Sequence, residues 1–225
     1  MATFETLDVS GLPSAIYGMR LPLKSHLKSD SWTDAGHFML GPNDYKLAKS
    51  LFNSGPEHAK WTRQVMVWVN ISAPRYWWSE WDTYKVGTSA NSESTMHTIE
   101  KRPLTVNDFE LPEGFAEKYP SKYETFTNYI TFLNDLISAY NLPIELPQDK
   151  EYKEDMFRIL KACLPESFVQ KRTVCLSYAT LANIYKQRKM HRLPQWNTDF
   201  VAWVKTLPYS EFITGEFQTE NLTTT

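Results

Sequence analysis

The sequence predicts an α+β fold or a mixed α/β layered domain, with a central sheet flanked by helices. One segment alternates like a buried strand, several others repeat apolar residues at helical spacing, and no internal repeat is visible. With 225 residues, 42% of them hydrophobic and 22% charged, the chain has enough apolar material for one large core. We therefore expect a single domain over residues 1–225, of which the polar stretch 210–225 forms a flexible tail.

The first elements follow from turn residues and capping signals. Residues Phe4–Val9 are expected to form a short strand, and the loop that follows is interrupted by glycines and prolines. The stretch NDYKLAKSLFNSG predicts a helix that Asn43 caps, with Asp44 in its positive first turn and Gly55 as its left-handed stop. Its inward-facing residues are Leu47, Ala48, Leu51 and Phe52.

A buried strand and an aromatic segment come next. The stretch QVMVWVNIS alternates with a period of two and is apolar on both faces, so it predicts a strand between layers. One face carries Val65, Val67, Val69 and Ile71, and the other carries Met66 and Trp68. The aromatic cluster that follows has two interpretations, a core layer with satisfied polar edges or a stacking site for a flat ring. Its members are Tyr76, Trp77, Trp78, Trp81 and Tyr84.

The second half predicts helices. Residues 103–121 contain three prolines and read as a surface connection, while spacings of three and four predict amphipathic helices over Tyr123–Tyr140 and Glu151–Cys163. After the apolar stretch TVCLS, Ser177 is expected to cap a third helix, and a last helix is expected from Trp196 to Leu207.

Arg188 lies four residues beyond Ile184 on the apolar stripe of the third helix. A buried guanidinium requires an anion or a carbonyl group as its partner, which indicates a ligand site. The alternative is that Arg188 belongs to the last turn of the helix and balances the negative end of its dipole. The pattern alone leaves both interpretations open.

Several function classes are disfavoured. A formal charge of -2 argues against nucleic acid and anionic membranes as partners, and no glycine-rich phosphate loop is present. The five histidines lack metal-ligand spacing, and Cys163 and Cys175 fall on apolar stripes. We expect a soluble protein that binds no metal and resides in the cytoplasm of a bacterium or of a virus-infected cell.

The C-terminal half resembles the flavin-dependent thymidylate synthases. Leu164-Pro165, Asn183 and Arg188 fit that family's spacing without a gap, Lys161 keeps the positive charge of a family arginine, and Gln195-Trp196 fits after a slip of one residue. From His58 to about Thr88 the first half also follows the family without gaps. Over the family signature, Arg-His-Arg-x-x-Ser-x-Asn-Glu-x-Ser, the chain has Thr83 and Lys85 in place of the two arginines, and Arg63 occupies a glutamate position.

The resemblance implies the folate-dependent reductive methylation of a uracil nucleotide, dUMP to dTMP. FAD would be the cofactor, with NADPH and methylenetetrahydrofolate as co-substrates. Catalytic roles would belong to Arg188, Glu93 and Ser94, where Arg188 stabilises negative charge on the pyrimidine ring. The residues implied to lie against the flavin are His58, Trp81, Asn183 and Tyr84. Those implied to bind substrate are Lys85, Ser89, Asn91, Lys161 and Arg188.

Two functional classes follow from this resemblance. The first is a divergent flavin-dependent enzyme, and the second is a non-catalytic nucleotide-binding protein of the same fold that has lost flavin chemistry. The lost signature arginines favour the second class, whereas the retained Arg188, Asn183 and His58 favour the first. Because the family completes its sites across subunits, the resemblance also implies a homotetramer.

Overall fold

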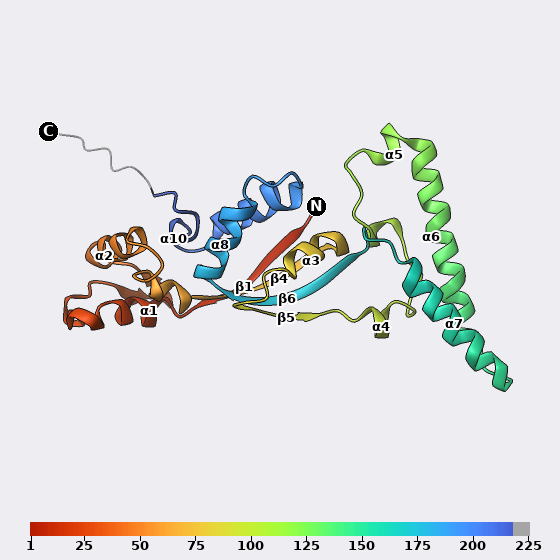
Figure 1. The fold of residues 1–225 in the computed structure, drawn as a ribbon, viewed down its shortest axis with the longest axis horizontal. Coiled ribbons are helices and arrows are strands. Elements are labelled where there is room, and N and C mark those ends of the chain that lie inside the picture. The colour runs from red at the N-terminus through yellow and green to blue at the C-terminus, as the bar shows by residue number, and fades with distance from the viewer. Residues whose placement is uncertain (218–225) are drawn as a thin grey trace. The chain divides into compact units, whose positions relative to one another are not determined.

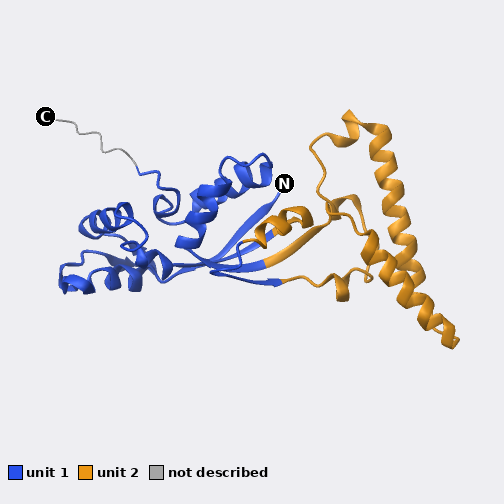
Figure 2. Cartoon of the chain, viewed as in Figure 1, with its two compact units in different colours: residues 1–71, 84–91, 173–225 blue, residues 72–83, 92–172 orange. Residues whose placement is uncertain are grey.

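The structure is a computed structural model that describes residues 1–217. The chain divides into two compact units, shown in Figure 2. Unit 1 comprises residues 1–71, residues 84–91 and the chain from residue 173 onward, and unit 2 comprises residues 72–83 and 92–172. Each unit is described by itself below.

A four-stranded sheet has the strand order β1-β4-β6-β5, and Figure 1 labels these strands. Their bounds are Thr3–Ser10 for β1, Met66–Pro74 for β4, Thr88–Ser92 for β5 and Val169–Ser177 for β6. The N–H of Tyr178 donates to the carbonyl of Val65, and the N–H of Arg75 donates to the carbonyl of Phe168, both at 3.0 Å. Strands β4 and β6 are therefore antiparallel. The predicted mixture of helices and sheet is confirmed.

The predicted buried strand is also confirmed. Val67, Val69 and Ile71 of β4 are completely buried, and Met66 and Trp68 on the opposite face are half-buried. A strand that is covered on both faces explains why both of its alternating sets are apolar.

Unit 1 contains most of the short helices. These are α1 Leu12–Met19, η1 Leu21–Leu23, η2 His26–Lys28, α2 Pro42–Asn53, η3 Lys60–Arg63, α8 Tyr178–Arg188, the π-helix η5 Gln195–Phe200, α9 Val201–Thr206 and α10 Glu211–Thr214. A hairpin pairs β2, Trp32–Asp34, with β3, His37–Met39.

Helix α2 is capped differently from the prediction. Its N-cap residue is Gly41, and the carboxylate of Asp30 accepts the N–H groups of Asn43 and Asp44 at 2.8 and 3.0 Å. Asn43 is therefore not the capping residue. Asp44 is fully buried, where its carboxylate accepts hydrogen bonds from Arg20, Ser29 and Ser31. Gly55 has φ +102°, which confirms the left-handed stop.

The C-terminal region of unit 1 is better packed than predicted. Ser177 Oγ accepts the N–H of Thr180 at 3.2 Å, which confirms the predicted cap of α8. The expected last helix begins as the π-helix η5 and continues as α9. Within the expected tail, Phe212 and Ile213 of α10 are buried, so residues 211–214 belong to the packed unit. Residues 218–225 of that tail lie outside the described residues.

Unit 2 is mainly helical. Its helices are α3 Arg75–Trp81, α4 Thr95–Thr98, η4 Val106–Asp108, α5 Phe115–Lys118, α6 Pro120–Tyr140 and α7 Pro147–Cys163. The two predicted amphipathic helices are confirmed as α6 and α7. Both begin earlier than predicted, because proline is well tolerated at the first helical position. Their core comprises Ile99, Leu104, Phe109, Ile130, Leu133, Leu136, Ile137, Leu160 and Leu164.

The tryptophans of α3 form an aromatic core layer. Trp77 and Trp81 stack at 5.1 Å between ring centroids with 27° between their planes, and Trp78 donates its Nε1–H to the carbonyl of Gln170 at 2.9 Å. Only 2% of Trp81 is exposed. The core interpretation is therefore correct for these rings. Because Trp81 is enclosed by protein here, it offers almost no surface to a flavin, and its expected stacking on one stays a prediction.

Candidate functional site

Arg188 is held by aromatic side chains of unit 1. Its Nε donates to the phenolic oxygen of Tyr84 at 2.7 Å, and its guanidinium carbon lies 4.9 Å from the ring centroid of Trp196 and 5.4 Å from that of Tyr84. The side chain is half-buried and belongs to the last residue of α8. The structure therefore places Arg188 at the helix end, while a hydroxyl group and two ring faces position its charge.

Tyr84, which accepts the hydrogen bond from Arg188, is itself held by contacts with Gln187 and Trp196. Its hydroxyl donates to Gln187 Oε1 at 3.2 Å, its ring meets Trp196 edge-to-face at 6.5 Å, and only 9% of the residue is exposed. Tyr84 thus offers little surface to a flavin, and the expectation that it lies against the cofactor stays a prediction. Its observed contacts serve to orient the guanidinium of Arg188.

A cavity of about 810 Å³ lies in unit 1 beside the first half of α8. Asn183 lines it, together with the cationic side chains of Arg63 and Lys186. Neither cation forms an ion pair within residues 1–217, and none of the described lining residues is acidic. We call this the basic cavity, because its charge favours an anionic ligand.

Gly87 permits close packing at the wall of the basic cavity. Its φ is +79°, and a Cβ atom built on it would lie 2.6 Å from the Oγ1 of Thr180. A side chain at this position would therefore strain the backbone and collide with α8. The glycine lets the segment after Lys85 approach the start of the helix.

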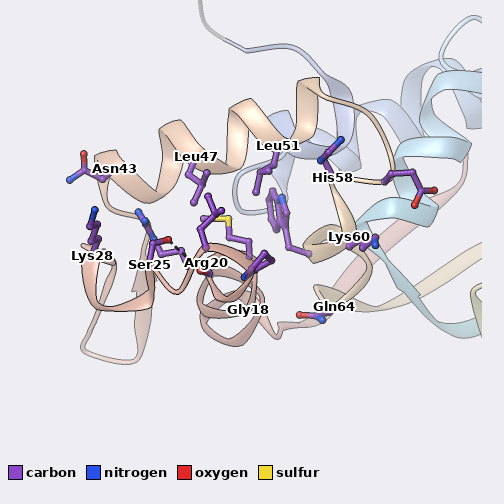
Figure 3. Close-up of a pocket in the computed structure, with 15 residues that line it drawn as sticks. Gly18, Arg20, Ser25, Lys28, Asn43, Leu47, Leu51, His58, Lys60 and Gln64 are labelled. Atoms are coloured by element: carbon purple, nitrogen blue, oxygen red, sulfur yellow. Dashed lines mark hydrogen bonds between the residues drawn. The ribbon is translucent and has the colours of Figure 1, made fainter.

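A larger cavity of about 1130 Å³ lies between α1, the turns that follow it, and α2. Figure 3 shows Lys28 and Asn43 near one end of α2, His58 and Lys60 at the other, and Leu47 and Leu51 between them. Its middle is thus apolar, cationic groups lie toward both ends, and the acidic Glu57 also lines it. We call this the elongated cavity.

The two cavities share a wall formed by residues 55–64. His58, Lys60, Trp61 and Gln64 line the elongated cavity, whereas Pro56, Ala59, Thr62 and Arg63 line the basic cavity. The structure therefore places His58 and Asn183, which were expected to contact one flavin, at two neighbouring cavities of the same unit.

Lys161 lies in unit 2 near the end of α7. Its half-buried ammonium group donates a hydrogen bond to Thr95 Oγ1, and burial together with the nearby charge of Arg75 lowers the pKa of the lysine. The Nη1 of Arg75 donates to the carbonyl of Leu164 at 3.1 Å. In the sequence Arg75 stands beside the aromatic cluster, where a stacking site was one of the two interpretations, but the family resemblance gave it no role.

The signature segment of the sequence forms an edge strand and the turn after it. The N–H of Glu93 donates to the carbonyl of Lys171 in β6 at 3.0 Å, and the Glu93 carboxylate accepts the N–H of Lys171 at 3.2 Å. Ser94 is the half-buried N-cap residue of α4. The exposed residues of the segment include Lys85, Ser89 and Asn91. Glu93 and Ser94 belong to unit 2, and the three exposed residues belong to unit 1.

Among residues 1–217, no group of three or more His, Cys, Asp or Glu side chains is arranged to hold a metal ion. Over the same residues, no helix is long and apolar enough to span a bilayer.

Three solved structures are similar to this chain. Thymidylate synthase X from Helicobacter pylori, with FAD and dUMP, has a TM-score of 0.65 and 14% identity over 96% of this chain and 98% of that one. Flavin-dependent thymidylate synthase ThyX from Helicobacter pylori, also complexed with FAD and dUMP, has a TM-score of 0.66 and 15% identity. The match covers 96% of this chain and 100% of that one. The UMP/dUMP methylase PolB from Streptomyces cacaoi, bound with 5-Br dUMP, has a TM-score of 0.62 and 16% identity. The match covers 96% of this chain and 95% of that one.

No protein-family model matches the sequence, and no curated protein matches it. At 14–16% identity, the similarity to the three structures establishes a shared fold.

Proposed function

We propose that this chain is a divergent flavin-dependent thymidylate synthase-like enzyme that methylates a uracil nucleotide, dUMP to dTMP. The observation that carries the proposal is the basic cavity. It combines Asn183 with Arg63 and Lys186, which form no ion pair among the described residues. Helix α8, which supplies Asn183 and Lys186, ends at Arg188. The fold of proteins that bind dUMP supports the same assignment over 96% of the chain.

Arg188 is assigned to the pyrimidine ring. Its planar guanidinium matches the carbonyl edge of uracil, and its positive charge stabilises the negative charge that develops on the ring as C5 attacks. The hydrogen bond to Tyr84 and the ring of Trp196 hold this charge in place before the ligand binds. A preorganised charge needs little rearrangement in the transition state.

The elongated cavity fits a dinucleotide such as FAD. A flavin dinucleotide has apolar ring faces and an anionic pyrophosphate. The cavity offers Leu47 and Leu51 for the rings and the cations Lys28 and Lys60 for the pyrophosphate. His58 lies at its wall, and Asn183 lies at the adjacent basic cavity. When bound and reduced, the flavin would supply the hydride for the methylation.

The remaining assignments concern the phosphate and the signature segment. We assign phosphate contacts to Lys85 and Lys161, with Ser89 and Asn91 as further donors from β5. Lysine keeps the positive charge of the family arginines but lacks their bidentate geometry. Catalytic roles for Glu93 and Ser94 belong to the same proposal. The active form is a homotetramer, with NADPH and methylenetetrahydrofolate as co-substrates.

A non-catalytic nucleotide-binding protein is the second candidate, and two observations favour it. Trp81 and Tyr84 are enclosed by protein, and the two signature arginine positions hold Thr83 and Lys85. Such a protein would keep the basic cavity and lose the flavin.

The absorbance spectrum of the purified protein, combined with a dUMP titration, separates the candidates. The enzyme predicts a yellow protein with a flavin band that persists after gel filtration, and it predicts dUMP binding. A colourless protein that binds dUMP even after incubation with excess FAD would support the second candidate. A protein that binds neither compound would refute both.

A further inference from the structure

Two cations are brought together in unit 2 by backbone contacts around Arg75. The N–H of Arg75 donates to the carbonyl of Phe168 at 3.0 Å, and its Nη1 donates to the carbonyl of Leu164 at 3.1 Å. Leu164 follows directly on α7, whose last turn carries Lys161. The fold therefore anchors the guanidinium of Arg75 three residues beyond Lys161, at the end of α7.

The hydrogen bonds of Lys161 add a third polar group to this pair. Its Nζ donates to the Oγ1 of Thr95 in α4, so a hydroxyl group lies against the ammonium group. Like charges that are held together are unfavourable, and burial increases the cost because less water screens them. The lowered pKa of Lys161, caused by burial and by the charge of Arg75, reflects this cost.

Glu166 lies against Arg75 and compensates the positive charge of Arg75 and Lys161 only weakly. Glu166 Oε1 is 3.4 Å from the Nη2 of Arg75, and the Glu166 side chain is 58% exposed. Exposed ion pairs of this kind contribute little free energy because solvent screens them. An anion with several oxygens would be a better partner, since it can accept from a planar guanidinium and an ammonium group at once.

We infer that Arg75, Lys161 and the hydroxyl of Thr95 form a subsite for a phosphate monoester. The inference rests on the proposed function, because we take the ester to be the 5′-phosphate of the uracil nucleotide. It adds a residue, Arg75, to which the resemblance assigns no role. At Thr83 and Lys85 the chain lacks the signature arginines, and Arg75 supplies a guanidinium from a different position of the sequence.

Calorimetric titrations of dUMP and deoxyuridine test this subsite. Arg75→Gln and Lys161→Gln should each weaken dUMP binding about tenfold, because each removes a charge-assisted contact. Both variants should bind deoxyuridine like the wild type, since the nucleoside lacks the phosphate. Glu166→Gln should strengthen dUMP binding, because the competing carboxylate charge is removed.

Arg158→Gln is the matched control. Arg158 lies on the same helix as Lys161, and its side chain is 75% exposed. This variant should bind dUMP like the wild type. Far-UV circular dichroism and thermal melts of every variant show whether it is folded, and Glu166→Gln tests the site independently if Arg75→Gln does not fold.

Inorganic phosphate separates a failure of this inference from a failure of the proposed function. If dUMP does not bind the wild type, but phosphate raises the melting temperature of the wild type and not of Arg75→Gln, the anion site stands and its assignment to a nucleotide is wrong. If Arg75→Gln and Glu166→Gln leave both dUMP affinity and phosphate stabilisation unchanged, the inference is overturned.

Discussion

The Nε of Arg188 donates a hydrogen bond of 2.7 Å to the phenolic oxygen of Tyr84. Tyr84 stands at the position of the histidine in the resembled signature, and Arg188 stands at the position of the arginine that follows the family asparagine. This contact joins the two halves of the family pattern within unit 1.

Arg188→Ala should abolish pyrimidine binding. The substitution removes the planar donor that we assign to the carbonyl edge of the ring. Arg188→Lys should restore little binding, because an ammonium group cannot reproduce the paired planar N–H donors of a guanidinium. The alanine variant should also lose about 1–3 kcal/mol of stability, because a charged hydrogen bond and a cation–π contact disappear. Titration of dUMP and urea unfolding measure the two effects. Normal dUMP binding by the alanine variant would show that Arg188 serves only the helix.

Tyr84→Phe should weaken dUMP binding about tenfold while the fold is kept, because the guanidinium loses its positioning acceptor but keeps its aromatic neighbours. Calorimetry measures the affinity. The matched control is Tyr119→Phe, which removes an exposed phenol in unit 2. Equal affinities for Tyr84→Phe and the control would mean that the hydroxyl does not position Arg188.

Stability above pH 10 should depend on Tyr185. Burial, followed by the hydrogen bond that its hydroxyl donates to Glu216 at 2.7 Å, raises the pKa of Tyr185 to about 12. The folded state therefore favours the protonated phenol. The resulting stability is fully present below the ordinary tyrosine pKa of about 10 and is lost as the pH rises toward 12.

Urea unfolding of the wild type and Tyr185→Phe between pH 8 and pH 12 measures this dependence. The wild type should lose roughly 1–3 kcal/mol more than the variant over the range. Buried Tyr178 is present in both proteins, so its own raised pKa cancels in the comparison. Parallel curves for the two proteins would contradict the prediction.

The chain should form a homotetramer, or at least a homodimer. Besides the resemblance, large apolar side chains are exposed in unit 1, including Leu23 at 82% and Leu27 at 90%. Exposed apolar groups that lie close together in the sequence are typical of interaction surfaces. Light scattering at micromolar concentration should return a multiple of the chain mass. A value near one chain mass would exclude the oligomer.

The sequence predicted the elements that bury one or both faces. The apolar periodicity of strand β4 and of helices α6 and α7 predicted them, because residues on a buried face are apolar and recur with the period of the element. Strand β5, Thr88–Ser92, is polar and largely exposed, so its pairing to the sheet left no such pattern. Asp30 caps α2 from a distant loop, and a local capping rule cannot find a partner that the tertiary fold supplies.

The candidate site was predictable only in part. The resemblance pointed to Arg188 and Asn183, and the structure places both on α8, where Asn183 lines the basic cavity. The pattern of aromatic residues could not reveal that Trp81 is enclosed by other tryptophans, since core and stacking roles use the same residue types. Arg75 and Lys161 are far apart in the sequence, so only the packing of unit 2 shows that Arg75 is held at the end of the helix that carries Lys161.

Formation of dTMP is the measurement that tests the central claim most directly. The purified protein is incubated with dUMP, methylenetetrahydrofolate, NADPH and FAD, and the nucleotides are separated by chromatography. We predict that the wild type forms dTMP, that Arg188→Ala forms none, and that product requires FAD. Bound dUMP without any dTMP, from a protein shown to be folded and oligomeric, would contradict the claim that this chain is an enzyme.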